Sequence, residues 1–238
     1  MLTLEHLAWK TPEGEQIIKD ITYNINDGKL VVVTGPNGGG KTTMAKLVAG
    51  LMSPESGKIL FDGKDITDMS ITERAKSGIA YAFQQPVRFK GLMVKDILEL
   101  AAGKELEDTE LCELLGKVGL CANDYINREL NSGLSGGEMK RIEIASVLAR
   151  NAKLSIFDEP EAGIDLWSFT RLVETFKHIQ EEKRGTLLII SHQERILEIA
   201  DEIIVVAKGV IRAAGTRDEI LPKLLEGEMS VKCPLGKE

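Results

Sequence analysis

Short, continuous apolar runs recur along the chain, and helical stretches separate them. The clearest is LVVVT at residues 30–34, a β-branched run that ends at a glycine, as a buried strand does. Three later runs share its length and character: KLSIFDEP at 153–160, GTLLIIS at 185–191 and DEIIVVAKG at 201–209. Strands that are buried on both faces are typical of parallel sheets covered by helices, so this rhythm predicts an α/β fold.

The amino end has a different pattern. Residues 2–9 and 17–25 alternate apolar and polar positions, with turn dipeptides nearby, so we expect antiparallel strands beside the parallel core. Residues from about 86 to 150 show only helical periodicity, which indicates an inserted helical subdomain. We therefore expect one domain over 1–238, made of an α/β core with the antiparallel strands (1–85 and 151–215), a helical subdomain (86–150) and a C-terminal tail (216–238).

Composition narrows the choice mainly by exclusion. The 238 residues carry a net charge of −7, which argues against nucleic acid as a partner. No apolar run approaches the ~18 residues of a membrane span, so we expect no direct membrane insertion. The amino end shows no signal-peptide pattern, which favours a cytoplasmic protein. Cys112, Cys121 and Cys233 form no CxxC motif, which indicates buried or tail thiols in a reducing compartment.

The stretch GPNGGGKTT at 35–43 matches the phosphate-loop pattern G-x-x-x-x-G-K-[ST] between a predicted strand and a predicted helix. Glycines let backbone N–H groups turn inward, and a helix amino end adds positive potential. We expect Lys41 to reach the β- and γ-phosphates of ATP and Thr42 to offer its hydroxyl to Mg²⁺. A plain glycine turn is the alternative. The residues predicted to bind nucleotide here are Asn37, Gly38, Gly39, Gly40, Lys41, Thr42 and Thr43.

Two adjacent acids, Asp158 and Glu159, follow a predicted strand. Ligands of parallel α/β sheets bind at the carboxyl ends of strands. We therefore expect Asp158 to hold Mg²⁺ through water and Glu159 to polarise the water that attacks the γ-phosphate. Gln84 and His192 also follow predicted strands and should emerge at the same edge. A helix cap is the alternative for the acids, and a structural role is the alternative for the histidine.

A second glycine-rich helix start reads LSGGEMKR at 134–141. Ser135 followed by Glu138 three residues later is the pattern of a helix capping box. Such a box does not explain the two glycines between them, Gly136 and Gly137. Glycines at a helix start allow an anion to approach the backbone, and the helix dipole favours it.

Taken in order, these motifs resemble those of the ATP-binding-cassette (ABC) ATPases over nearly the whole chain. The matching stretches are GPNGGGKTT at 35–43, FQ at 83–84, LSGGE at 134–138, IFDE at 156–159, GID at 163–165 and SH at 191–192. The resemblance implies a P-loop NTPase fold of the ABC nucleotide-binding type. It also implies that the chain hydrolyses ATP to ADP and phosphate.

The same resemblance implies an ATP-dependent dimer in which two copies pair head to tail. Ser135, Gly136 and Gly137 of each copy would then cap the γ-phosphate that the other copy holds. Asp165 would lie in the loop that couples the two sites. Gln84 would sense Mg²⁺ and the attacking water, and His192 would contact the γ-phosphate. Thr11 stands near the place of the family's adenine-stacking aromatic residue; Trp9 is either a substitute for it or a buried side chain.

Two stretches, SGGEMKRIEI and FQQPVRFKG, are similar to those of the ATPase subunit of the Suf iron–sulfur cluster assembly machinery. That similarity implies a scaffold partner of the SufB/SufD type that carries the cluster, and Arg88 and Phe89 are candidates for the contact. The alternatives are an ATP-binding subunit of an ABC membrane transporter and a regulatory ATPase with neither load.

Overall fold

The computed structural model describes residues 1–85, 89–130, 133–182 and 185–226, and its strands form one ten-stranded sheet. The strand order is β5-β4-β1-β2-β10-β9-β3-β8-β7-β6. The strands are β1 (Leu2–Lys10), β2 (Gln16–Ile25), β3 (Leu30–Thr34), β4 (Ser56–Phe61), β5 (Lys64–Asp65), β6 (Ile79–Ala82), β7 (Leu154–Asp158), β8 (Thr186–Ile190), β9 (Glu202–Ala207) and β10 (Val210–Thr216). The helices are α1 (Lys41–Ala49), α2 (Ile71–Ser77), α3 (Val94–Ala102), α4 (Asp108–Lys117), α5 (Ala122–Tyr125), α6 (Gly136–Ala149), α7 (Leu166–Glu181), α8 (Glu194–Glu198) and α9 (Arg217–Leu225).

The parallel part of the sheet contains the four predicted buried strands. β3 pairs with β8 and β9, and β7 pairs with β8 and β6, all in parallel. Every residue of β3, β7 and β8 is buried, as expected for strands covered on both faces. The sequence prediction of these strands is confirmed.

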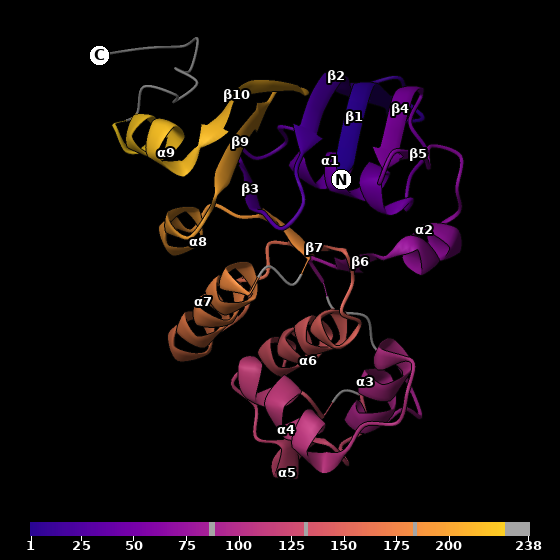
Figure 1. The fold of residues 1–238 in the computed structure, drawn as a ribbon, viewed down its shortest axis with the longest axis vertical. Helices are drawn as coiled ribbons and strands as arrows, with labels where there is room; N and C mark the ends of the chain where they lie inside the picture. Colours follow the sequence, from indigo (N-terminus) through magenta and orange to yellow (C-terminus); the bar gives the residue numbers. More distant parts are fainter. Residues whose placement is uncertain (86–88, 131–132, 183–184, 227–238) are drawn as a thin grey trace.

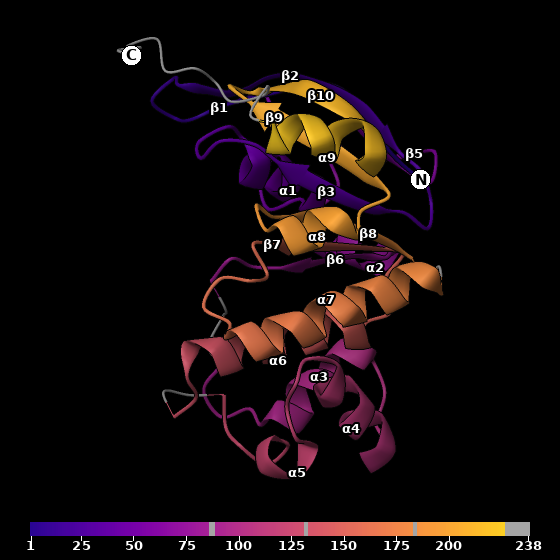
Figure 2. The same cartoon turned by 90° about the vertical axis from the view of Figure 1, so that its left-hand side faces the viewer.

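The amino-terminal strands form the antiparallel part, as predicted. β1 pairs with both β2 and β4, and β4 pairs with β5 (Figure 1). A single residue pair, Val210 with Asp20, joins this part to β10. Figure 2 shows β1 and β2 on one side of α1 and β6, β7 and β8 on the other, so the phosphate-loop helix lies between two layers of the sheet.

The parallel strands separate two hydrophobic cores. Along β3, Val31 and Val33 pack with α1 and the antiparallel strands in one core. Leu30 and Val32 point the other way, into a core that α3, α4, α6 and α7 complete. Figure 2 shows the resulting order of layers, from β1 and β2 through α1 and the parallel strands to α7 and the inserted helices.

The segment between β6 and β7 is helical in its described residues, with one isolated bridge between Met93 and Glu129. The expectation of buried cysteines is wrong for Cys112 and Cys121, which are both exposed. On α4, Leu111 and Leu115 face the core; a residue one step along a helix is rotated by about 100°, which turns Cys112 to solvent. Cys233 and Arg88 lie outside the described residues.

In the described part of the chain, no helix combines the length and the apolar character that crossing a bilayer requires.

Candidate functional site

The phosphate loop connects β3 to α1 and holds its lysine against its own backbone. Lys41 is only 6% exposed. Its Nζ donates hydrogen bonds to the carbonyl oxygens of Gly35 at 2.7 Å and Pro36 at 2.9 Å. Burial lowers the pKa of Lys41, while the carboxylates of Glu159 and Asp158 oppose that shift. The ammonium group therefore lies in the loop within the electrostatic reach of both acids.

The remaining loop residues divide into an exposed tip and a buried base. Asn37 and Gly38 are exposed, Gly39 and Gly40 are buried, and Thr43 lies half-buried in the first turn of α1. A Cβ at Gly39 would lie 2.7 Å from the carbonyl oxygen of Val206 in β9. Part of the glycine requirement is therefore set by packing of the loop on the neighbouring strand.

Asp158 and Thr42 meet at the carboxyl ends of the strands, as the sequence suggested. Thr42 Oγ1 donates to Asp158 Oδ1 at 3.0 Å, and Tyr81 Oη donates to Asp158 Oδ2 at 2.8 Å. Burial and the Asp158 carboxylate raise the pKa of Tyr81, so the phenol stays a donor. A hydroxyl and a carboxylate side by side are hard oxygen ligands of the kind that Mg²⁺ prefers, so the pair fits that ion. No sequence motif marks Tyr81, which lies inside the short strand β6.

Glu159 contacts Gln84 directly. Gln84 Nε2 donates to Glu159 Oε2 at 2.6 Å. The backbone N–H of Glu159 still bonds to Ile190 O at 3.0 Å, but its φ of 47° lies in the left-handed region, which is strained for a residue with a side chain. His192 is exposed at the end of β8. Desolvation and the Lys41 ammonium lower the pKa of His192, and Glu159 opposes the shift.

A buried ion pair that the sequence did not reveal joins α6 to this edge. Lys140 is 1% exposed; it donates to the carbonyl oxygens of Phe83 and, at 3.3 Å, Gln84. Glu143 accepts the Phe83 N–H at 2.8 Å and lies 3.7 Å from Lys140 Nζ. Burial lowers the pKa of Lys140 and raises that of Glu143, and each opposes the shift of the other. The pair fixes the backbone around Gln84 to the helix that begins after Ser135.

A second unpredicted pair lies beside the histidine. Ser191 Oγ donates to Glu161 Oε1 at 2.6 Å and accepts the Gln193 N–H at 3.0 Å. Burial raises the pKa of Glu161. This pair holds the turn after Glu159 against the end of β8.

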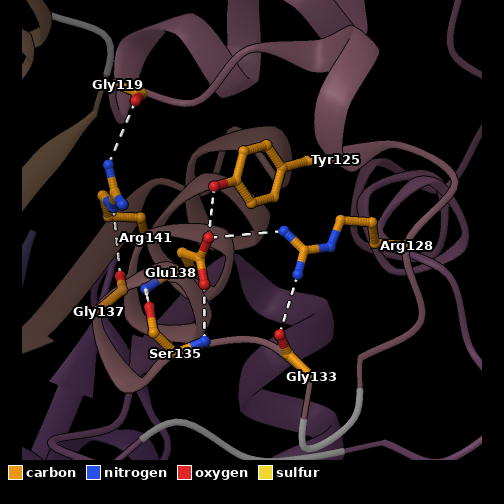
Figure 3. Close-up of polar contacts among 8 residues, drawn as sticks. All are labelled: Gly119, Tyr125, Arg128, Gly133, Ser135, Gly137, Glu138 and Arg141. Carbon is orange, nitrogen blue, oxygen red and sulfur yellow. Dashed lines mark hydrogen bonds and ion pairs between the residues drawn. The ribbon is translucent and has the colours of Figure 1, made fainter.

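The second glycine-rich helix start is capped as predicted (Figure 3). The Ser135 N–H donates to Glu138 Oε2 at 2.7 Å, and the Glu138 N–H donates to Ser135 Oγ at 3.2 Å. The Tyr125 hydroxyl donates to Glu138, and Arg128 lies 3.6 Å from the same carboxylate. These bonds, with that from Tyr125 the largest cause, lower the pKa of Glu138 to about 2.

The two glycines of this helix differ in their surroundings. A Cβ at Gly137 would lie 2.6 Å from the carbonyl oxygen of Gly163, whereas one at Gly136 would meet nothing within 4 Å. The expectation that both glycines serve an approaching phosphate is therefore incomplete, because packing within the chain already excludes a side chain at Gly137. Ser135 and Gly136 are exposed. Asp165 is also exposed and caps α7, with Oδ1 accepting the N–H groups of the next turn.

Two residues, Trp9 and Thr11, lie near the position where an aromatic side chain is expected to stack on adenine. Trp9 is half-buried and packs against the core under β1. Thr11 lies in the turn after β1, and its Oγ1 accepts the Glu15 N–H at 3.3 Å. The packing of Trp9 gives it a structural role whatever else it contacts.

The sequence of this chain matches a known protein family. The family model described as ABC transporter matches residues 18–162. An uncharacterised ABC transporter ATP-binding protein of Methanocaldococcus jannaschii is 36% identical over 234 residues, which cover 94% of this chain and 93% of that protein. LptB, the lipopolysaccharide export system ATP-binding protein of Escherichia coli, is 32% identical over 226 residues, 92% of each chain.

Solved structures agree with this match. A nucleotide-free cassette from an ABC transporter has a TM-score of 0.80 at 25% identity and covers 100% of this chain and 99% of that one. A dimeric, post-hydrolysis cassette bound to ADP and phosphate has a TM-score of 0.81 at 24% identity, covering 91% and 99%. With its phosphate loop, its paired acids and this likeness in sequence and fold, the chain belongs to the ABC transporter family and is an ATPase with the P-loop ABC fold.

Proposed function

We propose that this chain hydrolyses Mg-ATP between two copies of itself and that hydrolysis moves a separate membrane protein. The contact of Gln84 with Glu159, next to the pair of Thr42 and Asp158, carries the proposal. These two contacts support the proposal, because they bring the proposed base, Glu159, and the proposed metal ligands to one edge of the sheet beside the phosphate loop. In α/β sheets this edge is where ligands bind.

The residues of the site divide the work. Lys41 and the loop N–H groups bind the phosphates, and Thr42 and Asp158 hold the Mg²⁺. The ion, when bound, supplies positive charge that offsets the charge on the phosphate oxygens. Glu159 accepts the proton of the attacking water, and the Gln84 amide orients its carboxylate. A ring N–H of His192 can donate a hydrogen bond to the γ-phosphate.

The second copy completes the site. Ser135 and Gly136 are exposed at a helix amino end, where backbone N–H groups and the helix dipole favour an anion. The exposed loop at Asp165 continues the same surface. The dimeric cassette bound to ADP and phosphate, whose fold this chain shares, supports a paired arrangement.

Substitution of the candidate base tests hydrolysis. Glu159→Gln should keep the affinity for ATP, lose at least 100-fold in phosphate release, and accumulate an ATP-dependent dimer. Phosphate release, fluorescent-nucleotide titration and sedimentation measure the three quantities. Glu13→Gln, in an exposed turn, is the matched control. Normal turnover in Glu159→Gln would remove Glu159 as the base.

The comparisons favour a membrane protein as the partner that ATP hydrolysis moves. The relatives reported above are transporter ATP-binding proteins, including one of lipopolysaccharide export. A Suf scaffold protein is the second candidate for the partner. It is supported only by the similarity of SGGEMKRIEI and FQQPVRFKG to the Suf ATPase subunit. None of the matches reported above supports it.

An apolar surface beside Gln84 suits either load. Two adjoining cavities of about 160 and 220 Å³ share the residues Tyr81, Phe83, Ser146 and Val147. Phe89, which is 41% exposed, also lines the smaller cavity. Purification of the chain with its native partner separates the loads: a detergent-solubilised permease supports transport, and a soluble scaffold supports cluster assembly.

A further inference from the structure

Two consecutive large apolar residues are exposed in the first turn of α7. Leu166 is 65% exposed and Trp167 is 85% exposed, the highest value among the exposed large hydrophobic residues in the described ranges. Isolated exposed leucines are ordinary on protein surfaces. A tryptophan can bury roughly 150–250 Å², so a Leu–Trp pair open to water is a costly surface unless another molecule covers it.

The residue that precedes the pair caps the backbone of this first turn. Asp165 Oδ1 accepts the backbone N–H of Trp167 at 3.1 Å and that of Ser168 at 3.0 Å. These bonds lower the pKa of Asp165, so its carboxylate caps the helix at neutral pH. A side chain whose backbone is already ordered loses less freedom when it is covered by a partner.

The first turn of α7 is also fastened to the helix that starts after Ser135. Arg141 Nη1 donates to Ser168 Oγ at 2.7 Å. The Gly163 carbonyl, three residues before Leu166, lies so close to Gly137 that no Cβ would fit between them. The exposed start of α6 and the segment that carries the exposed Leu–Trp pair therefore contact each other directly.

We propose that Leu166 and Trp167 form a hydrophobic anchor that docks on a second copy of this chain beside the nucleotide sites. This inference rests on the proposed function, in which Ser135 and Asp165 face the other copy. The pair directly follows Asp165, and its helix contacts the helix that starts after Ser135, so it is continuous with that interface. A two-fold dimer contains the anchor twice, and tryptophan is among the residues that dominate interface energies.

The test uses the Glu159→Gln protein, in which ATP holds the dimer. Trp167→Ser should weaken ATP-dependent dimerisation at least tenfold in sedimentation, because each dimer loses two tryptophans, and should leave the nucleotide affinity of the monomer unchanged. Leu100→Ser changes an apolar residue of α3 that is 66% exposed, close to the 65% of Leu166; it is the control and should dimerise normally.

Fluorescence gives a second readout. The chain has two tryptophans, so Trp9→Phe leaves Trp167 as the only tryptophan, and excitation at the red edge of the absorption band selects it over the tyrosines. Addition of ATP should shift its emission to shorter wavelength and protect it from acrylamide. A dimer that forms with Trp167 still quenched as in the monomer, and that Trp167→Ser does not weaken, would overturn the anchor and leave the proposed function standing. Failure of the Glu159→Gln protein, with both tryptophans intact, to dimerise in ATP would remove the proposed function and the anchor with it.

Discussion

The two glycines at the start of α6 provide a matched pair for testing how the chain packs. An alanine at Gly137 places its Cβ 2.6 Å from the Gly163 carbonyl oxygen. Carbon–oxygen contacts are ordinarily ~3.3 Å or longer, so one backbone segment must move by about 0.7 Å. Overpacking of this kind costs about 1–3 kcal/mol. An alanine at Gly136 meets nothing within 4 Å and creates no such overlap.

The comparison of the two variants isolates the overlap. Both substitutions restrict the unfolded chain similarly, a gain of about 0.4–1 kcal/mol each, so that term cancels between them. Gly137→Ala should therefore be less stable than Gly136→Ala by about 1–3 kcal/mol. For a domain of this length the difference corresponds to roughly 2–12 °C in Tm.

Calorimetry and urea unfolding of the two variants without nucleotide measure this difference. The ATP turnover rate of Gly136→Ala tests the proposed site separately from stability. This variant keeps the fold and yet places a methyl group on the surface proposed to contact the γ-phosphate of the other copy. Equal stability of the two variants would refute the argument, since it would mean that the Gly163 loop yields without cost.

Two further substitutions test the buried and half-buried carboxylates. Tyr125→Phe removes the largest cause of the low pKa of Glu138, so that pKa should rise from about 2 towards its ordinary 4.5 in a carbon-detected NMR titration. A depressed carboxylate pKa stabilises the fold above the unfolded pKa, and this contribution is lost as pH falls towards 2; the variant should therefore show less of this acid-dependent loss. Lys140→Met leaves Glu143 buried without its cation and should cost about 3–5 kcal/mol in urea unfolding at pH 7. Adding Glu143→Gln should recover part of that loss, and no recovery would show that the two side chains act independently.

Much of the architecture could be predicted because its residues carry local signals. β3, β7, β8 and β9 are continuous apolar runs, and the phosphate loop has a fixed spacing between a strand and a helix. β4, β5 and β10 were missed. Each has exposed residues and lies in the antiparallel part of the sheet or pairs antiparallel with β9, so its pattern is weak and depends on partners that the sequence does not identify.

The site could be predicted where its side chains lie at strand ends or in a motif of fixed spacing. Asp158 and Glu159 stand at the end of β7, Gln84 follows β6, and Thr42 belongs to the phosphate-loop motif at the start of α1. The structure brings these residues together in pairs. Lys140 could not be found in this way. It lies among other charged residues in KRIE, and only the distant carbonyl groups that it contacts distinguish it from a solvent-exposed lysine. The catalytic and binding roles assigned to these residues stay predictions.

The burial of the parallel strands on both faces has a consequence for how the chain finds its alignment. β3, β7 and β8 present apolar side chains to both cores, so sliding one strand by a single residue would exchange apolar groups for apolar groups. Hydrophobicity alone then discriminates poorly between the correct pairing and its neighbours. The polar side chains near the strand ends distinguish the native alignment from a shifted one. In the native alignment Asp158 accepts hydrogen bonds from Thr42 and Tyr81, and Ser191 donates one to Glu161; a shifted strand would lose these bonds. Asp158 and Thr42, which are assigned to nucleotide chemistry, thus also help to fix the alignment of the central strands.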